Sequence, residues 1–175
     1  LDGARLGCAL TSPACDLTLA DVAALTDVFY IGGTKNGALF GEAVVIRDKE
    51  IQEHFFRVKK QRGAVLAKGF LLGAQFEALF TDGLYWDLAR HANRMAARLQ
   101  EGVKAIGLPL LVESPTNQVF VVVPDSMLPA LRELAAFEVW DKPDRLHTAI
   151  RLVTSYATGE EDVDGFLRGL ATVVG

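Results

Sequence analysis

The segment Tyr30-Ile-Gly-Gly-Thr-Lys35-Asn-Gly37 carries the residues of this sequence that are best suited to chemistry. Lys35 follows an apolar run typical of a buried strand, and the flanking glycines allow a ligand to approach the backbone closely. A lysine in partly apolar surroundings can attack a carbonyl group. The alternative is a hairpin turn with a solvated lysine. A Walker phosphate loop is excluded, because it needs Gly-Lys-Ser/Thr and the order here is Gly-Thr-Lys.

The opening segment Leu1-Asp2-Gly3-Ala4-Arg5 contains the second candidate. We expect it to be the end of a strand running into a loop, and an Asp at the carboxyl end of a strand lies where α/β sheets bind ligands. Asp-Gly is also a common turn dipeptide, so the alternative is a plain turn. Because a natural protein rarely starts in this way, we expect the chain to be the C-terminal piece of a longer polypeptide.

The elements that must position these residues alternate between helix and strand. A capping box, Thr18 with Asp21, predicts a short helix to about residue 26. Apolar runs at 28–31 and 43–46 predict buried strands of a sheet covered on both faces, as in α/β folds. Residues 49–80 are predicted to be helical with interruptions around Gly63, Gly69 and Gly73, and apolar residues at helical spacing predict a long helix over 85–106.

After Pro109 the pattern becomes that of a small α+β unit. We expect strands over 119–123, 137–141 and 149–154 and a helix over 126–135. A second capping box, Thr158 with Glu161, predicts the last helix. The domain boundaries that follow are 1–82 for part of a large domain, 83–107 for a connecting helix and 108–175 for a small domain.

Composition limits the class of protein. The 175 residues are 50% apolar, and 18 Lys and Arg against 22 Asp and Glu give a net charge of −4. This argues against a nucleic-acid binder or a protein of anionic membranes. No uncharged stretch approaches the ~18 residues of a membrane-spanning helix. Cys8 and Cys15 match neither a disulfide framework nor a zinc pattern, so we expect reduced thiols in a cytoplasmic protein.

Taken together, Asp-Gly-Ala-Arg and Gly-Gly-Thr-Lys-Asn-Gly resemble the threonine aldolase and β-eliminating lyase family, whose members depend on pyridoxal 5'-phosphate (PLP). The likeness continues through Gly41-Glu-Ala-Val-Val-Ile46 and Phe80-Thr-Asp-Gly-Leu84 to Ile150-Arg-Leu-Val-Thr-Ser-Tyr156. It covers essentially the whole chain and corresponds to the C-terminal half of such an enzyme. The fold it implies is α/β, with the C-terminal part of a PLP-dependent transferase-like large domain (a mostly parallel sheet in three layers) followed by a small α+β domain.

The resemblance also implies roles for individual residues. Lys35 would bind the cofactor aldehyde as a Schiff base, and Asp2 would pair with the pyridine nitrogen and keep it protonated. Arg5 would lie beside the cofactor and the substrate carboxylate. Arg151 would bind that carboxylate, because a guanidinium grips two oxygens at once. Without the resemblance, Arg5 fits a structural ion pair, and Arg151 fits a surface cation on an edge strand.

Two further residues are weaker candidates for the cofactor site. Thr34 would contact the cofactor or act only as a turn residue. The basic run of residues 57–62, together with Lys68, would approach the cofactor phosphate or form a solvated helix face; with a net charge of −4, a nucleic-acid surface is not expected there. No metal ligands are predicted.

The function implied is cleavage of a β-hydroxy-α-amino acid, threonine or allo-threonine, to glycine and an aldehyde. The alternatives are a β-eliminating lyase and a catalytically incomplete fragment that acts only in assembly. The expected partners are the amino-acid substrate, the N-terminal half of the same enzyme and further copies in a homodimer or homotetramer. We expect the isolated piece to be inactive, since the phosphate-binding loop and the residue that stacks on the cofactor belong to the other half.

Overall fold

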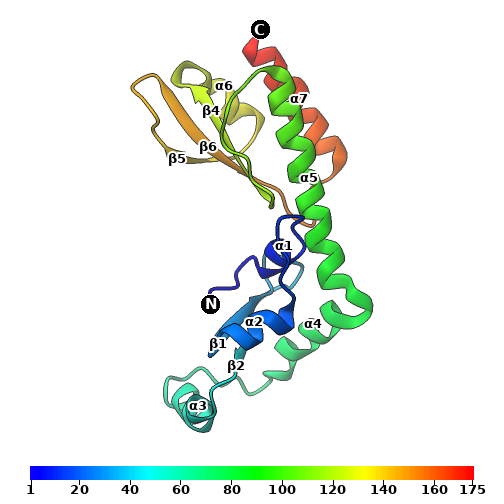
Figure 1. Ribbon diagram of the computed structural model, residues 1–175, viewed down its shortest axis with the longest axis vertical. Coiled ribbons are helices and arrows are strands. Elements are labelled where there is room, and N and C mark those ends of the chain that lie inside the picture. The colour runs from blue at the N-terminus through cyan, green and yellow to red at the C-terminus, as the bar shows by residue number, and fades with distance from the viewer. The chain divides into compact units, whose positions relative to one another are not determined.

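The computed structural model describes residues 1–175, which form two compact units, Leu1–Ala89 (unit 1) and Arg90–Gly175 (unit 2) (Figure 1). The boundary falls inside the longest helix, α5 (Leu84–Ile106). Each unit has a hydrophobic core of its own. The α/β class expected from the sequence is confirmed. No helix of the chain combines the length and the apolar character needed to cross a membrane.

Unit 1 surrounds a short antiparallel hairpin with helices. Its elements before α5 are α1 (Leu6–Leu10), α2 (Leu19–Leu25), β1 (Val28–Gly32), β2 (Glu42–Ile46), α3 (Lys49–Gln61), α4 (Phe70–Phe80) and a 3₁₀ turn, η1 (Thr81–Gly83). The predicted capping box at α2 is present, with Thr18 Oγ1 accepting from the Asp21 amide and Asp21 accepting from the Thr18 amide. The helical stretch breaks between α3 and α4, but Gly73 lies inside α4, so the interruption predicted there is wrong.

The strands of this chain pair antiparallel, and Val28 of β1 lies opposite Ile46 of β2. Parallel pairing is seen only where the first residues run beside β1. The amino group of Leu1 donates to the Val28 carbonyl (2.8 Å), the Tyr30 amide donates to the Leu1 carbonyl (3.3 Å), and the Gly32 amide donates to the Gly3 carbonyl (2.9 Å). Bonds from one residue to two alternating partners on its neighbour are typical of parallel strands. β2 forms where predicted but is not buried, since Val44 is 50% exposed. The reason is that β1 is its only strand neighbour.

Unit 2 is a two-layer α+β structure, as expected for the small domain. After α5 it contains β3 (Leu110–Val112), β4 (Gln118–Pro124), a 3₁₀ turn η2 (Asp125–Met127), α6 (Leu128–Leu134), β5 (Glu138–Asp141), β6 (His147–Val153) and α7 (Glu160–Val174). The strands form an antiparallel sheet in the order β3-β4-β6-β5.

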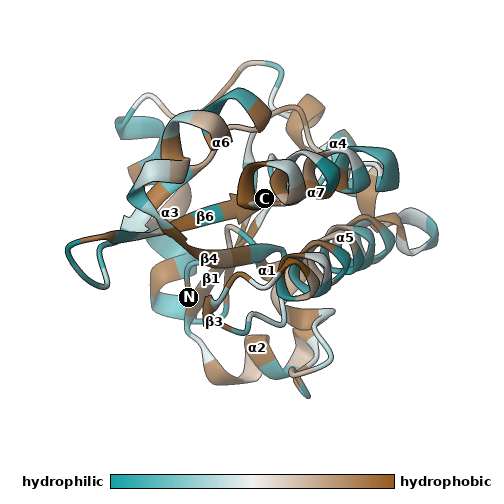
Figure 2. Ribbon diagram, turned by 90° about the horizontal axis from the view of Figure 1, so that it is seen from above, coloured by the Kyte–Doolittle hydropathy of each residue, from teal (hydrophilic) through white to brown (hydrophobic).

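Helices cover one face of this sheet. Alternate residues of β4 (Val119, Val121 and Val123) are buried against α5, α6 and α7. The second half of α5 lies beside α7 (Figure 1), where Arg98 forms a two-pronged ion pair with Asp164. Both helices have a polar and an apolar side (Figure 2). The opposite face of the sheet carries Arg151.

The start of α7 differs from the prediction by one residue. Its N-cap is Gly159, and the Asp162 carboxylate accepts from the Gly159 amide at 2.8 Å, so the predicted capping box of Thr158 with Glu161 is wrong. The Thr158 hydroxyl instead accepts from the Ser155 amide (2.9 Å), and the Thr158 carbonyl contacts His91 (2.7 Å). Because Thr158 already serves the preceding turn, the helix begins after it.

Candidate active site

Lys35 lies at the outer end of a tight turn that directly follows β1. The amides of Asn36 and Ala38 both donate to the Gly33 carbonyl, at 2.9 and 3.0 Å, and this closes the turn. Gly37 has φ +106°, a conformation that other residues rarely adopt. The Lys35 side chain is exposed and makes no hydrogen bond or ion pair. The amine is therefore presented by a fixed backbone while the side chain remains free to move.

Two buried polar side chains, Asn36 and Tyr85, hydrogen-bond the turn to α5. The Asn36 side-chain amide donates to the Tyr85 carbonyl at 2.8 Å. The Tyr85 hydroxyl donates to the Gly32 carbonyl at 3.1 Å, and the ring is fully buried. Each bond joins α5 to one side of the lysine. Both groups are buried, so losing either partner would leave an unpaired polar group in the core, which is costly.

Asp2 lies in the same unit, and its neighbours favour its charged form. A hydrogen bond from Tyr30, a hydrogen bond from the Ala4 amide (3.0 Å) and the positive charge of Lys35 lower the pKa of the Asp2 carboxyl group. The same bond to Asp2 raises the pKa of Tyr30 to about 12, so its hydroxyl stays protonated and can donate. An ionised carboxylate thus lies within electrostatic reach of the lysine amine.

The remaining candidates of unit 1 are placed differently. Arg5 is the N-cap of α1, and its Nε is buried without a hydrogen-bond partner. Thr34 is exposed beside Lys35. Lys68 is exposed in the loop between α3 and α4, with no side-chain hydrogen bond or ion pair. Cys8 is buried, which raises the pKa of its thiol to about 11 and keeps it from acting as a nucleophile at neutral pH.

These side chains fit a cofactor that carries an aldehyde and a basic ring nitrogen. Lys35 offers an unengaged amine for the aldehyde, and Asp2 offers a charged carboxylate for a protonated nitrogen. The Arg5 Nε is a buried donor that lacks an acceptor. The unit therefore contains an unengaged amine, an anion and an unpaired donor.

Arg151 belongs to unit 2 and lies on β6, an interior strand between β4 and β5, so the alternative of an edge strand is wrong. Its Nη2 donates to Glu138 and its Nη1 donates to Gln118 Oε1 at 3.2 Å. Its Cζ lies 5.1 Å from the centre of the Trp140 ring, within the range of a cation–π contact. Its Nε is buried and has no partner.

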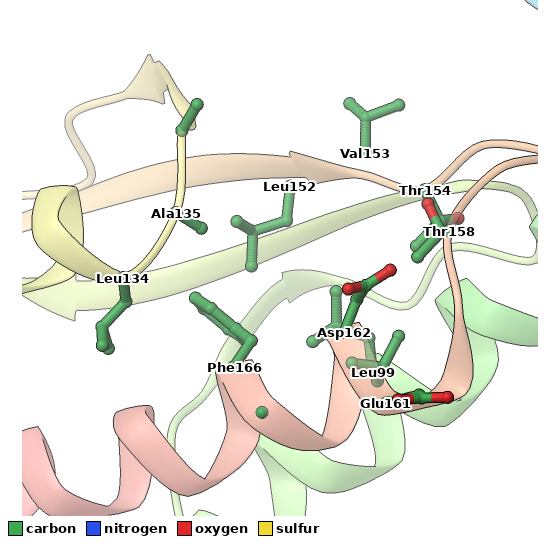
Figure 3. Close-up of a pocket in the computed structure, with 13 residues that line it drawn as sticks. Leu99, Leu134, Ala135, Leu152, Val153, Thr154, Thr158, Glu161, Asp162 and Phe166 are labelled. Atoms are coloured by element: carbon green, nitrogen blue, oxygen red, sulfur yellow. The ribbon is translucent and has the colours of Figure 1, made fainter.

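A pocket of about 450 Å³ in unit 2 is lined by none of the predicted catalytic or ligand-binding residues. Leu99, Leu152, Asp162 and Phe166 are among the residues that line it (Figure 3). Asp162 already accepts from Gly159, and the Thr154 hydroxyl donates to the Ala92 carbonyl at 2.7 Å. No lining residue has a buried polar atom without a partner. We therefore place no site there.

Sequence reasoning missed the residues that support Lys35 and Arg151. Asn36 stands next to Lys35, but nothing in the sequence pairs it with Tyr85, which we had expected only in the core. On the sheet of unit 2 a signal existed, since Gln118 and Phe120 share one face of β4 and Glu138 and Trp140 share one face of β5. The register places Phe120 and Glu138 directly opposite Arg151.

Comparisons with known proteins identify a family and relatives for this chain. Residues 1–126 match the β-eliminating lyase family. The low-specificity L-threonine aldolase of Pseudomonas aeruginosa is 31% identical over 181 residues, which cover 100% of this chain and 50% of that protein. The low-specificity L-threonine aldolase of a Pseudomonas species is 35% identical over 133 residues, which cover 75% of this chain and 38% of that protein.

A solved structure gives the same result. Threonine aldolase from Leishmania major is 43% identical, with a TM-score of 0.95, over 100% of this chain and 51% of that one. The chain thus spans about half the length of the relatives it matches. With the family match covering well over half of the sequence, from the Asp-Gly-Ala-Arg segment past β4, we conclude that this chain belongs to the β-eliminating lyase family.

Proposed function

We propose that the protein containing this chain is a PLP-dependent aldolase that cleaves threonine or allo-threonine to glycine and an aldehyde. The observation that carries the proposal is that an exposed Lys35 amine and an ionised Asp2 lie within electrostatic reach of each other in one unit. The three relatives described above are threonine aldolases, and the one from Leishmania major matches the whole of this chain at 43% identity. PLP, when bound, supplies an electron-accepting ring that stabilises negative charge at the substrate α-carbon.

Each candidate site residue has a defined task in this proposed reaction. The Lys35 amine would hold the cofactor through its aldehyde group, and its unrestrained side chain suits a residue that must give way to the amine of the substrate. Asp2 remains ionised and holds a proton on the ring nitrogen, with Tyr30 and the Ala4 amide securing it. Arg151 binds the amino-acid carboxylate and so orients the bond to be broken. Arg5 donates to the cofactor or to that carboxylate, and Thr34 and Lys68 are secondary cofactor contacts.

The family match favours a second candidate, β-elimination. This reaction would remove an α-proton and expel a leaving group from the β-carbon, giving ammonia and a keto acid. The two candidates differ in their products. Incubation of the whole enzyme with L-threonine, L-allo-threonine and a β-substituted alanine should release glycine and acetaldehyde from the first two. Ammonia and a keto acid without glycine would contradict the aldolase assignment.

The proposed function also has consequences for the assembly and the cellular location of the enzyme. We infer an enzyme of the cytoplasm that acts as a homodimer or homotetramer and contains the other half of the sequence in the same subunit. At least about half of each relative described above lies outside the aligned region, which supports the inference of a second half in the same subunit. Sedimentation of the PLP-loaded enzyme measures the oligomeric state, and a monomer with full activity would contradict it.

A further inference from the structure

The guanidinium of Arg151 is enclosed on the outer face of the unit 2 sheet by groups from the two neighbouring strands, β4 and β5. Glu138 of β5 is its direct cross-strand neighbour and accepts from Nη2. Gln118 of β4 accepts from Nη1 at 3.2 Å. Trp140 lies 5.1 Å from the guanidinium carbon and packs against Phe120 with ring centres 5.0 Å apart. The side chain is thus held by an anion, an amide and an aromatic ring.

These contacts are unequal in how firmly they are anchored. The Arg151 side chain is only 17% exposed, whereas the Glu138 side chain is 70% exposed. Ion pairs with a partner in solvent contribute little to stability, because water competes for the charge and the long side chain loses freedom. Of the three groups, Glu138 is therefore the one that can leave at low cost.

Arg151 also has unused binding capacity. A guanidinium binds a carboxylate best through two parallel N–H groups. Here a single N–H group meets a carboxylate, and the buried Nε has no acceptor at all. A second carboxylate that engaged two N–H groups would outcompete Glu138 and satisfy a buried donor at the same time.

We propose that Glu138 is a displaceable counter-ion of Arg151, which occupies the guanidinium in the empty site and is expelled by the α-carboxylate of the amino acid. Gln118 and Trp140 keep the guanidinium in place during the exchange. The proposal rests on the proposed function, since it takes Arg151 as the residue that binds the substrate carboxylate. It makes Glu138 a residue that sets substrate affinity by competition.

The test removes the charge of Glu138 and keeps its shape. In the PLP-loaded whole enzyme, Glu138→Gln should lower KM for L-threonine about 2–5-fold, the equivalent of an exposed ion pair, and leave kcat unchanged. The matched control is Glu113→Gln, which removes an equally exposed acid of the same unit from an ion pair with Lys104. This control should leave KM unchanged.

A second measurement does not depend on turnover. In a background in which Trp86 and every tryptophan outside these 175 residues are replaced by Phe, Trp140 is the remaining tryptophan and lies against Arg151. Titration with glycine should change its fluorescence, with a dissociation constant about 2–5-fold lower in Glu138→Gln. A higher dissociation constant would show that Glu138 orients Arg151, and an equal one would show that it does not compete; either result overturns the proposal. Failure to release glycine from threonine would contradict the proposed function instead, and the titration would still decide the role of Glu138.

Discussion

In the turn of unit 1 the backbone around Lys35 is fixed and the side chain is free, whereas on the sheet of unit 2 the side chain of Arg151 is itself held. The turn is closed on the Gly33 carbonyl and fastened to Tyr85 through Asn36. Arg151 has Glu138, Gln118 and Trp140 around its guanidinium. The difference suits the two tasks proposed. A covalent anchor must change partners in each turnover, whereas a carboxylate-binding fork must keep one orientation.

The largest effect should come from removing the free amine. Lys35→Ala should abolish covalent attachment of PLP to the whole enzyme, since no other side chain in the turn can replace the amine. Borohydride reduction followed by peptide mass analysis measures the attachment. Lys49→Ala, which removes another exposed lysine of unit 1, should retain it. Cofactor trapped on a peptide without Lys35 would show that the anchor lies elsewhere.

The next largest effect should come from replacing the guanidinium of Arg151 by an ammonium group. Arg151→Lys should raise KM for the amino acid and lower kcat, at a total cost of about 1.5–3 kcal/mol in kcat/KM. Arg98→Lys is the control, because Arg98 also makes a two-pronged pair, with Asp164, away from the proposed site. The absorbance of bound PLP should be unchanged in both variants. If Arg151→Lys lost PLP but kept its KM, its assignment to the substrate would be wrong.

Rigidity of the turn can be tested separately from its chemistry. Gly37 has φ +106°, and a Cβ added there would lie 2.8 Å from a Leu88 methyl group. Gly63 has φ +68°, and a Cβ added there would have no other atom within 4 Å. Gly63→Ala should therefore lower the free energy of unfolding by about 1–2 kcal/mol for backbone conformation alone. Gly37→Ala should cost about 1–3 kcal/mol more, because it also overpacks the core. Denaturant unfolding of the whole enzyme measures both, and equal losses would show that the turn is not packed as described.

The smallest effect should appear at the start of α7. Asp162→Ala removes the acceptor for the Gly159 amide and should cost about 1 kcal/mol, whereas Glu161→Ala should cost about 0.3 kcal/mol through the helix dipole alone. Amide hydrogen exchange at the first turn of α7 compares them. A larger effect of Glu161→Ala would support the capping box expected from the sequence. The fully formed box at α2, Thr18 with Asp21, shows that the same pattern succeeds where the Thr has no competing task.

The sequence by itself determined most of the elements and marked the candidate residues. Periodicity located α5 and β4, and two short motifs marked Asp2 and Lys35, because such signals depend on neighbours close along the chain. The tertiary structure alone decided what surrounds those residues. Asn36 meets Tyr85 across 49 positions, and Arg151 meets Gln118 across 33. Strand register and helix packing set such pairings, and a single local pattern is compatible with many of them, so the freedom of Lys35 and the restraint of Arg151 become visible only once the chain is folded.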